Sequence, residues 1–296
     1  MGLIPTRRQV EWNGGYSNNW TTKSFCEYAH NVKLGRDHAG PMQGQKEDDG
    51  YESLKHDCKF FDLIHIDPWK KYPKYEEGLT WTVNMIKFCF NLNPHIEYEI
   101  GTEEGIRPFE LKETEKFVND INSRLNSDIF NKIKYIVVQS GALVKENQNL
   151  GNHDPNKLEK TIKIAKKHGL LTKEHNGDYL GSNLIKEKMN IGLDSINIGP
   201  EISATETQTY LDELNDEKCE EFNTFFNLSY QSRKWEKWVT KDFNPNVDRK
   251  KLISICGHYV FSNPIFIEKI KNKIPFIEEK IKNNVTKHLK NLCNGR

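Results

Sequence analysis

The sequence predicts an α/β fold, a (β/α)8 or TIM barrel. Short apolar segments alternate along the 296 residues with longer amphipathic segments. This order is typical of parallel strands joined by helical crossovers. Eight strand-like segments fit the length of one barrel, so we expect a single domain over residues 1–296. A doubly wound open sheet is the alternative, but the sequence has none of its glycine-rich dinucleotide fingerprint.

The predicted strands are short apolar runs bounded by polar residues and glycine. They are residues 2–8, 31–37, 61–67, 95–101, 134–140, 169–175, 193–199 and 252–258. The gaps between them are long enough for crossover connections. The strands therefore run parallel in the predicted fold.

Three segments between the strands have the pattern of amphipathic helices. Residues 75–92 repeat apolar side chains every three or four positions. Residues 110–125 begin acidic and end with the basic Arg124, which complements the helix dipole. Residues 156–169 end in glycine, a common residue just after a helix.

One gap, between residues 199 and 252, is too long for a single crossover. It contains a helical segment and then the aromatic-rich residues 222–239. We therefore predict a helical and aromatic insertion at about residues 212–250, between the seventh and eighth strands. It would cover the barrel mouth or contact a partner.

The composition excludes several classes of protein. Hydrophobic residues make up 36% and charged residues 29%, which is enough apolar material for a core. A net charge of +1 gives no global signal for nucleic acid or for a membrane surface. No signal peptide or membrane-spanning run is recognisable. The six cysteines are scattered, so we expect reduced thiols in a cytoplasmic protein.

Polar side chains gather at the carboxyl ends of the predicted strands, where a barrel places its active site. They are Gln9, Glu11, Asp37, His38, His65, Asp67, Glu97, Glu99, Glu103, Gln139, Ser140, Glu174, His175, Asn176, Asp178, Asn197 and His258. Carboxylates with a few imidazoles suit a divalent cation. Because core packing does not require such residues, their coincidence at one end favours an enzyme.

Each cluster also has a structural interpretation. Asp37 and His38 alone would more often form a hydrogen-bonded turn than a metal site. His65 could be a satisfied core histidine, with Asp67 capping the next turn. Residues 97–105 could be an acidic loop. A plain connection explains residues 173–179 least well, because nearly all of them are polar or glycine.

Seven of these segments carry a resemblance to a known family. They are RRQVEWNGGYSNNWT (7–21), RDHAGP (36–41), IHID (64–67), EIGTEEG (99–105), VVQSG (137–141), EHNGDY (174–179) and INIGPEIS (196–203). In this order the chain resembles the class II tagatose-bisphosphate aldolase accessory-subunit family and, more distantly, the class II ketose-bisphosphate aldolases. The resemblance covers nearly the whole predicted barrel.

The resemblance implies a site for a metal ion and a ketose phosphate. It implies that Asp37 is catalytic and that His38 and His175 bind the metal, with Glu99 nearby. Gln139 stands where the aldolases have a third metal histidine, a departure that the accessory family shares. We therefore expect a mixed ligand set, which is His38, His175, Glu99 and Asp67, with Asp178 as an alternative carboxylate.

The remaining assignments follow from the strand ends and the resemblance together. Catalytic roles are expected for Asp37, Glu99 and Asp178. Contacts to substrate are expected for Gln9, Arg36, Asn176, Asn197 and Ser140. A phosphate would pair with Arg36 or, on other loops, with Arg7, Arg8 or Arg107. We expect Zn²⁺, with Mn²⁺ or Mg²⁺ as alternatives.

Three functions remain open, of which one is a sugar-binding protein without turnover. The first is a metal-dependent enzyme that cleaves the C3–C4 bond of a phosphorylated or activated ketose or inverts C4, with Asp37 taking the C4 hydroxyl proton. Proton abstraction next to the carbonyl would instead give an isomerase or a C3 epimerase. The second is a non-catalytic subunit that stabilises a class II aldolase, and a homo-oligomer is also compatible. The retained acids and imidazoles favour the enzyme.

Overall fold

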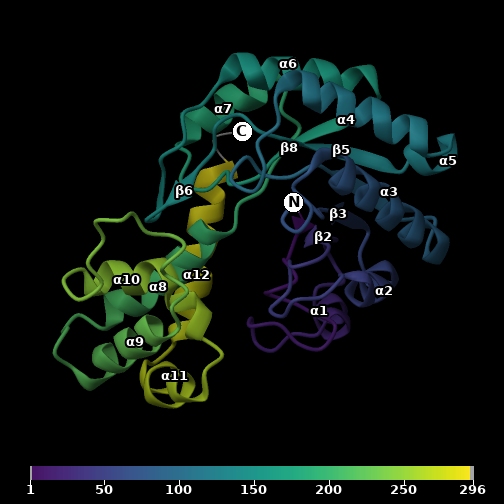
Figure 1. The fold of residues 1–296 in the computed structure, drawn as a ribbon. Coiled ribbons are helices and arrows are strands. Elements are labelled where there is room, and N and C mark those ends of the chain that lie inside the picture. The colour runs from purple at the N-terminus through teal and green to yellow at the C-terminus, as the bar shows by residue number, and fades with distance from the viewer. Residues whose placement is uncertain (1, 294–296) are drawn as a thin grey trace. The chain divides into compact units, whose positions relative to one another are not determined.

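The computed structural model describes residues 2–293, which form two compact units (Figure 1). The first unit comprises Met1–Gly141, Asp154–His175 and Ile191–Ser195. The second comprises Ala142–His153, Asn176–Asn190 and Ile196–Arg296. The strands of a parallel sheet lie mainly in the first unit, and the second unit is mainly helical.

A seven-stranded sheet forms the centre of the first unit. Its strands are β1 (Gly2–Leu3), β2 (Lys33–Ala39), β3 (Leu63–Ile66), β4 (Glu97–Ile100), β5 (Ile133–Val138), β8 (Leu171–Glu174) and β9 (Ser195–Ile196). They follow one another across the sheet in chain order, and the pairs from β1 to β8 are parallel. Chain order is the order of a (β/α)8 barrel, whereas a doubly wound sheet reverses it. The predicted α/β fold with barrel-like order is confirmed.

Helices connect these strands along the outside of the sheet (Figure 1). They are α1 (Thr22–Tyr28), α2 (Tyr51–Phe60), α3 (Tyr75–Leu92), α4 (Leu111–Arg124), α5 (Ser127–Phe130) and α6 (Pro155–Lys167). The three predicted helices are confirmed as α3, α4 and α6. Gly169 follows α6 with φ +70°, the conformation in which glycine commonly ends a helix.

The two faces of the sheet carry different chemistry. Ile64, Tyr98 and Ile100 are fully buried in the core that also includes apolar residues of α3 and α4. Burial of each such side chain stabilises the fold by about 1.5–3 kcal/mol. Because successive residues of a strand point to opposite faces, His65 and Glu99 point away from these helices. They are partners in register on β3 and β4.

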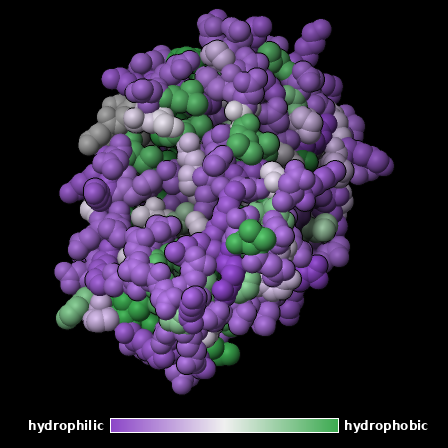
Figure 2. Space-filling model, turned by 90° about the vertical axis from the view of Figure 1, so that its left-hand side faces the viewer, coloured by the Kyte–Doolittle hydropathy of each residue, from purple (hydrophilic) through white to green (hydrophobic). Residues whose placement is uncertain are grey.

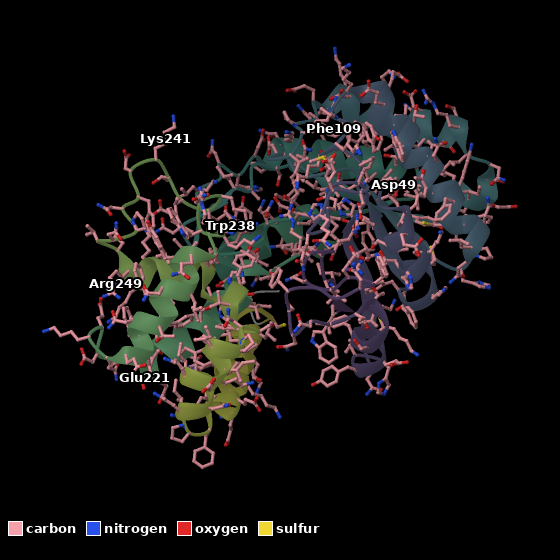
Figure 3. All side chains as sticks on the ribbon, turned by 60° about the horizontal axis from the view of Figure 1, so that its bottom comes forward. Asp49, Phe109, Glu221, Trp238, Lys241 and Arg249 are labelled. Atoms are coloured by element: carbon pink, nitrogen blue, oxygen red, sulfur yellow. The ribbon has the colours of Figure 1, made fainter. Side chains whose placement is uncertain are left out.

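The second unit contains a short hairpin and a group of helices. The hairpin is β6 (Val144–Lys145) with β7 (Gln148–Asn149), and the helices are α7 (Ser182–Ile191), α8 (Pro200–Glu213), α9 (Glu220–Gln231), α10 (Arg249–Cys256), η1 (Gly257–Val260), α11 (Pro264–Lys269), η2 (Lys271–Lys273) and α12 (Ile277–Cys293). Buried aromatic residues of α8, α9 and α11 form its core. Arg249 lies over two of them, at 5.1 Å from the ring centroid of Phe222 and 4.4 Å from that of Phe226 (Figure 3).

The predicted strand at residues 252–258 is wrong, because this segment is α10 followed by η1. Leu252, Ile253, Ile255 and Cys256 are all buried, and their spacing is that of one helical face. They pack in the aromatic core of the second unit. A short apolar run has no periodicity that separates a buried strand from a buried helix.

Two other predictions from the sequence differ from the structure. Residues 212–250, expected as an insertion between strands seven and eight, contain α9 and irregular segments. No strand follows β9 within residues 2–293, so no eighth strand closes the sheet there. The first predicted strand is regular only over Gly2–Leu3, although Thr6 still bridges Asp37 in parallel.

One face of the molecule is mostly hydrophilic, with apolar side chains in small separate groups (Figure 2). Among the described helices, none is both long enough and apolar enough to cross a bilayer.

A candidate metal centre at the carboxyl ends of the strands

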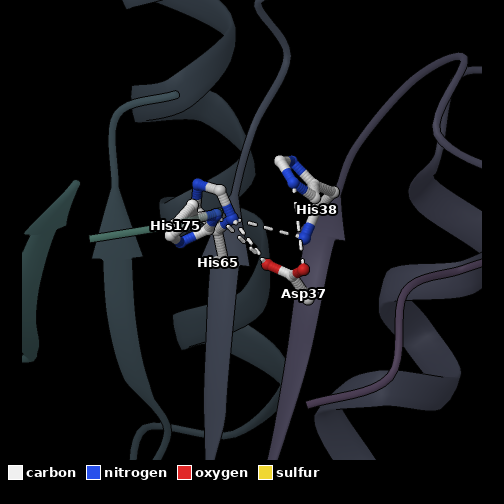
Figure 4. A group of neighbouring side chains, drawn as sticks. All are labelled: Asp37, His38, His65 and His175. Carbon is white, nitrogen blue, oxygen red and sulfur yellow. Dashed lines mark hydrogen bonds and ion pairs between the residues drawn. The ribbon is translucent and has the colours of Figure 1, made fainter. Parts of the chain in front are cut away.

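Four side chains of the first unit converge at the carboxyl ends of its strands. Asp37 and His38 come from β2, His65 comes from β3, and His175 directly follows β8 (Figure 4). One nitrogen or oxygen ligand atom from each of them lies within 4.8 Å of all the others. The strand order β2-β3-β4-β5-β8 thus brings together residues that are far apart in sequence.

A β-bulge brings both Asp37 and His38 to the cluster. Consecutive residues of a regular strand point to opposite faces. On β2, however, Arg36 pairs with Ile64 and Ala39 pairs with Ile66, so Asp37 and His38 together oppose the single residue His65. His38 has a φ of +47°, in the left-handed region. Such bulges re-aim side chains and are frequent beside active sites.

Gly40 lets the chain turn away directly after this bulge. Its φ is +143°, and a Cβ there would lie 2.7 Å from the carbonyl oxygen of Asp67. Real Cβ contacts are not that short, so the position requires glycine. The loop after β2 therefore packs directly on the end of β3.

Each histidine of the cluster bonds an acceptor with the ring nitrogen that faces away from it. The three bonds run from His38 Nδ1 to Asp67 Oδ2 (2.6 Å), from His65 Nε2 to Gly101 O (3.1 Å) and from His175 Nε2 to Glu99 Oε1 (2.7 Å). A carboxylate or a carbonyl can only accept, so these three nitrogens carry hydrogen. The other nitrogen of each neutral ring is then a lone-pair donor.

The three remaining nitrogens face Asp37. Its carboxylate oxygens lie 3.3 Å from His65 Nδ1, 3.7 Å from His175 Nδ1 and 3.8 Å from His38 Nε2. His65 Nδ1 also accepts a 3.3 Å hydrogen bond from the backbone of His38. His175 Nδ1 is buried and makes no hydrogen bond. Three imidazole nitrogens and a carboxylate are a donor set that suits Zn²⁺, and a cation would satisfy the buried His175 nitrogen.

Glu103, on the loop after β4, completes the acidic side of the cluster. Its Oε1 lies 3.1 Å from His38 Nε2 and 3.4 Å from His175 Nδ1. The sequence placed Glu103 at a strand end but gave it no role. The only signal was its place in the acidic segment 97–105.

The charges of this cluster stabilise one another. Burial raises the pKa of Asp37, but the positive charges of His38 and His175 outweigh it and lower that pKa to about 2. Burial lowers the pKa of His175, but Asp37 and Glu99 raise it to about 10. The pKa of His38 is also raised, chiefly by Asp37 and Glu103 against burial. Groups that hold protons this strongly are also donors for which a divalent cation would compete.

Lys173 lies behind His175 and was missed by the sequence analysis. Its ammonium group forms an ion pair with Glu99 Oε2 and lies 4.6 Å from the centroid of the Tyr135 ring. Lys173 is 4% exposed. It shares a face of β8 with His175, because the two are two residues apart. A buried lysine in the strand LTKE, two positions before a histidine, was the available signal.

Asp178 does not belong to the cluster of the first unit. It lies in the second unit, where its Oδ1 accepts hydrogen bonds from the backbone N–H groups of Gly199 (2.9 Å) and Glu201 (2.8 Å) at the start of α8. Burial raises the pKa of Asp178 to about 6. This geometry is that of a helix N-terminal cap and differs from the catalytic or ligand role expected from the sequence.

Arg36 does not have the role expected of it either. All five of its N–H groups are used, in two bonds to Asp57 (2.8 and 3.0 Å) and single bonds to the carbonyls of Pro5 and Val10 and the hydroxyl of Thr22. Arg36 is buried, since only 1% of the residue is exposed. Every N–H group of Arg36 thus has a protein partner in this structure, whereas the sequence analysis expected it to contact substrate.

The other predicted contact residues are bonded locally. Gln9 accepts from the backbone N–H and the hydroxyl of Thr6, and Ser140 donates to Glu174. Gln139 accepts from Phe109 N and donates to the carbonyls of Thr102 and Arg107, which fixes the loop after β4. Asn176 and Asn197 lie in the second unit, where their carbonyls accept from Asn149 and Gly177.

A barrel-like α/β protein with a histidine and carboxylate cluster at its strand ends is thus defined. No protein-family model and no curated protein matches the chain. Among solved structures, it is similar to a probable tagatose 6 phosphate kinase from Sinorhizobium meliloti, with a TM-score of 0.75 and 17% identity over 99% of this chain and 86% of that one.

Two further solved structures share this fold. The fructuronate-tagaturonate epimerase UxaE from Cohnella laeviribosi matches with a TM-score of 0.58 and 11% identity, over 90% of this chain and 69% of that one. The YdjI aldolase from Escherichia coli matches with a TM-score of 0.51 and 13% identity, over 91% and 80%. At these identities the likeness establishes the fold, and it agrees with the family resemblance seen in the sequence.

Proposed function

We propose that the protein is a metal-dependent enzyme that acts on a phosphorylated or otherwise activated ketose by retro-aldol and aldol chemistry. One observation carries the proposal. Three histidines on β2, β3 and β8 each turn one ring nitrogen toward Asp37 while the other nitrogen is held by an acceptor. The fold shared with an epimerase and an aldolase supports the same reaction class.

The proposed ligands are His38 Nε2, His65 Nδ1 and His175 Nδ1, and the Asp37 carboxylate that these nitrogens face is proposed as the base. Zn²⁺ fits this donor set best, with Mn²⁺ and Mg²⁺ as alternatives. Asp67 and Glu99, which the sequence suggested as ligands, bond the far nitrogens of His38 and His175, and so are proposed to orient the rings. When bound here, the cation would polarise the ketose carbonyl as a Lewis acid.

The carboxylates that reach the open side of the cluster are proposed to move protons. Asp37 and Glu103 have side chains that are 13% and 21% exposed, whereas that of Glu99 is 2% exposed. As an ionised base, Asp37 accepts the C4 hydroxyl proton while the C3–C4 bond breaks and leaves its electron pair on C3. Return of that proton when the bond re-forms on the other face of the aldehyde gives the C4 epimer. Departure of the aldehyde, followed by transfer of the proton from Asp37 to C3, gives the aldolase reaction.

Metal content of the purified protein tests the proposal. Wild type is expected to hold about one Zn²⁺ or Mn²⁺ per chain by elemental mass spectrometry, and His38→Ala and His65→Ala are expected to lose it. His95→Ala is the matched control, because His95 is exposed and lies before β4. Wild type is then assayed for cleavage and epimerisation of ketose phosphates. Unchanged metal content in both cluster variants would refute the ligand assignment.

The alternative of a non-catalytic aldolase subunit has less support in the structure. The aromatic residues 222–239, which the sequence offered as an interface, contribute Phe222, Phe225 and Phe226 to the buried core of the second unit. A subunit that acts only by binding would also be indifferent to Asp37→Asn. Loss of turnover in that variant, with unchanged metal content, favours the enzyme.

A further inference from the structure

Four arginines lie on β2 and on the loops after β1 and β4, and three of them are already paired. Arg36 is held by Asp57. Arg7 bonds Glu11 (2.7 Å) and Asp48 (2.5 Å), and it donates to the carbonyl of Gly40. Arg107 forms a two-bond ion pair with Glu113. These three guanidinium groups stabilise the loops and leave little capacity for a ligand.

Arg8 differs from these three. It lies in the loop after β1 and is half-buried. Its backbone carbonyl accepts hydrogen bonds from Tyr16 N (2.9 Å) and Gln45 Nε2 (3.5 Å), which fix its main chain. Its guanidinium forms no ion pair with any carboxylate of residues 2–293. A fixed main chain with an uncommitted guanidinium is what an anion site requires.

Lys70 is a second cation next to this loop. It is exposed in the loop after β3, and its Nζ donates to the carbonyl of Met42 at 2.9 Å. No carboxylate among the described residues pairs with it. Burial and the positive charge of Arg8 lower the pKa of Lys70, against the opposing effect of Asp67. Lys70 therefore experiences both the charge of Arg8 and that of the residue that holds His38.

Residues 42–45 connect the two cations to the cluster. Met42 O bonds Lys70, Gln45 bonds the carbonyl of Arg8, and between them Gln43 Nε2 donates to Asp67 Oδ2 at 3.0 Å. The same Asp67 oxygen accepts the hydrogen bond from His38. Two cations without counter-ions thus flank one segment that is bonded to the proposed metal site. Neighbouring like charges are unfavourable unless an anion lies between them.

We propose that Arg8 and Lys70 bind the anionic group of the substrate, a phosphate or a carboxylate carried by the ketose. This proposal rests on the proposed function, because it places the anion beside the carbonyl-binding cluster. Arg8 supplies a planar fork that matches two oxygens of either anion, and Lys70 supplies a point charge.

Titration calorimetry on the Co²⁺-loaded protein tests this site. The ligands are inorganic phosphate, a ketohexose 6-phosphate, the corresponding ketohexuronate and the uncharged ketohexose. The proteins are wild type, Arg8→Gln, Lys70→Gln and, as a control for loss of a positive charge, Arg124→Gln, whose side chain pairs with Glu76 on the helices. Co²⁺ binding is followed separately by its visible absorption.

We expect Arg8→Gln to weaken binding of the charged ligands about tenfold or more, and Lys70→Gln to weaken it severalfold. Binding of the uncharged ketose and of Co²⁺ should not change. If Arg8→Gln weakens binding of the ketohexose 6-phosphate more than that of the ketohexuronate, the anionic group is a phosphate. The reverse result indicates a carboxylate. Wild-type affinity of both variants for every anion would overturn the site, as would an equal loss in Arg124→Gln. If wild type fails to bind Co²⁺ while Arg8→Gln still loses phosphate, the proposed function fails and the anion site stands.

Discussion

Glu99 bonds His175 Nε2 at 2.7 Å with one carboxylate oxygen and forms an ion pair with Lys173 through the other. All three side chains are buried. Glu99 lies on β4, Lys173 lies on β8, and His175 directly follows β8. The carboxylate therefore has two tasks, since it fixes the ring of a proposed ligand and neutralises a buried lysine.

Glu99→Gln should weaken the hold on the His175 ring and should remove the negative charge that neutralises Lys173. Loss of the negative charge is expected to weaken Co²⁺ or Zn²⁺ binding about 10–100-fold. Lys173 would be left buried without a counter-ion, at a cost in unfolding free energy of about 3–5 kcal/mol. Metal titration and urea unfolding measure the two effects.

Glu97→Gln is the matched control for that change. Glu97 lies on the same strand and pairs with Lys134 at 2.5 Å, but both side chains are partly exposed. An exposed pair contributes about 1 kcal/mol or less. Equal effects of the two substitutions on metal affinity would contradict the role given to Glu99.

Asp178→Asn is expected to stabilise the protein above pH 6. The folded-state pKa of Asp178 is raised to about 6, so folding favours the protonated form. Stability is therefore unaffected by this group well below its unfolded pKa of about 4 and falls as the pH rises through 6. Asparagine keeps an oxygen that can cap α8 and removes the charge.

The expected gain from Asp178→Asn is about 1–3 kcal/mol at pH 8 and near zero at pH 4. Urea unfolding at the two pH values measures it. Asp178→Ala, which also removes the cap, should instead lose about 1 kcal/mol at pH 4. A large loss of turnover in Asp178→Asn, with the fold intact, would restore the catalytic role that the sequence suggested.

Arg36→Met should destabilise the first unit without changing substrate affinity. It leaves the fully buried Asp57 carboxylate without its partner, at a cost of about 3–5 kcal/mol. Arg124→Gln breaks an exposed pair and should cost less than about 1 kcal/mol. Chemical unfolding and the KM of Arg36→Met check the two statements. A raised KM with unchanged stability would show that Arg36 contacts substrate after all.

Gly40→Ala should disturb the metal centre from outside it. The new Cβ would meet the Asp67 carbonyl at 2.7 Å in a backbone conformation that alanine avoids. We expect a loss of more than about 1 kcal/mol in unfolding free energy and weaker metal binding, because Asp67 holds His38. Gly105→Ala is the control, because a Cβ there would contact nothing within 4 Å. Unaltered metal affinity in Gly40→Ala would show that the loop after β2 does not support the site.

The sequence was sufficient for the order of the parallel strands and for the strand ends at which the polar cluster lies. Alternating apolar and amphipathic segments gave the parallel strands, and polar residues at strand ends gave Asp37, His38 and His175. Local periodicity could not separate a buried helix from a buried strand at residues 252–258. The reason is that the aromatic residues that cover this segment lie on α9 and α11.

The expected roles of Arg36 and Asp178 differ from their observed bonds for a common physical reason. Arg36 and Asp178 have the residue types of a functional site, but their partners, Asp57 and the start of α8, lie about 20 residues away along the chain. A sequence shows which groups can bond and not which of them are already bonded. For the same reason, the sequence could not show that Lys173 pairs with Glu99 or that one nitrogen of His65 faces the cluster.

The bulge in β2 also determines whether the proposed roles of Asp37 and His38 could be transferred to another protein. Because a single extra residue turns Asp37 and His38 to one side of the sheet, the two side chains reach the cluster together only with that irregularity. An Asp-His pair on a regular strand of another barrel would place one side chain at the site and the other against the helices. An engineer who wishes to move this chemistry must copy the backbone defect along with the side chains.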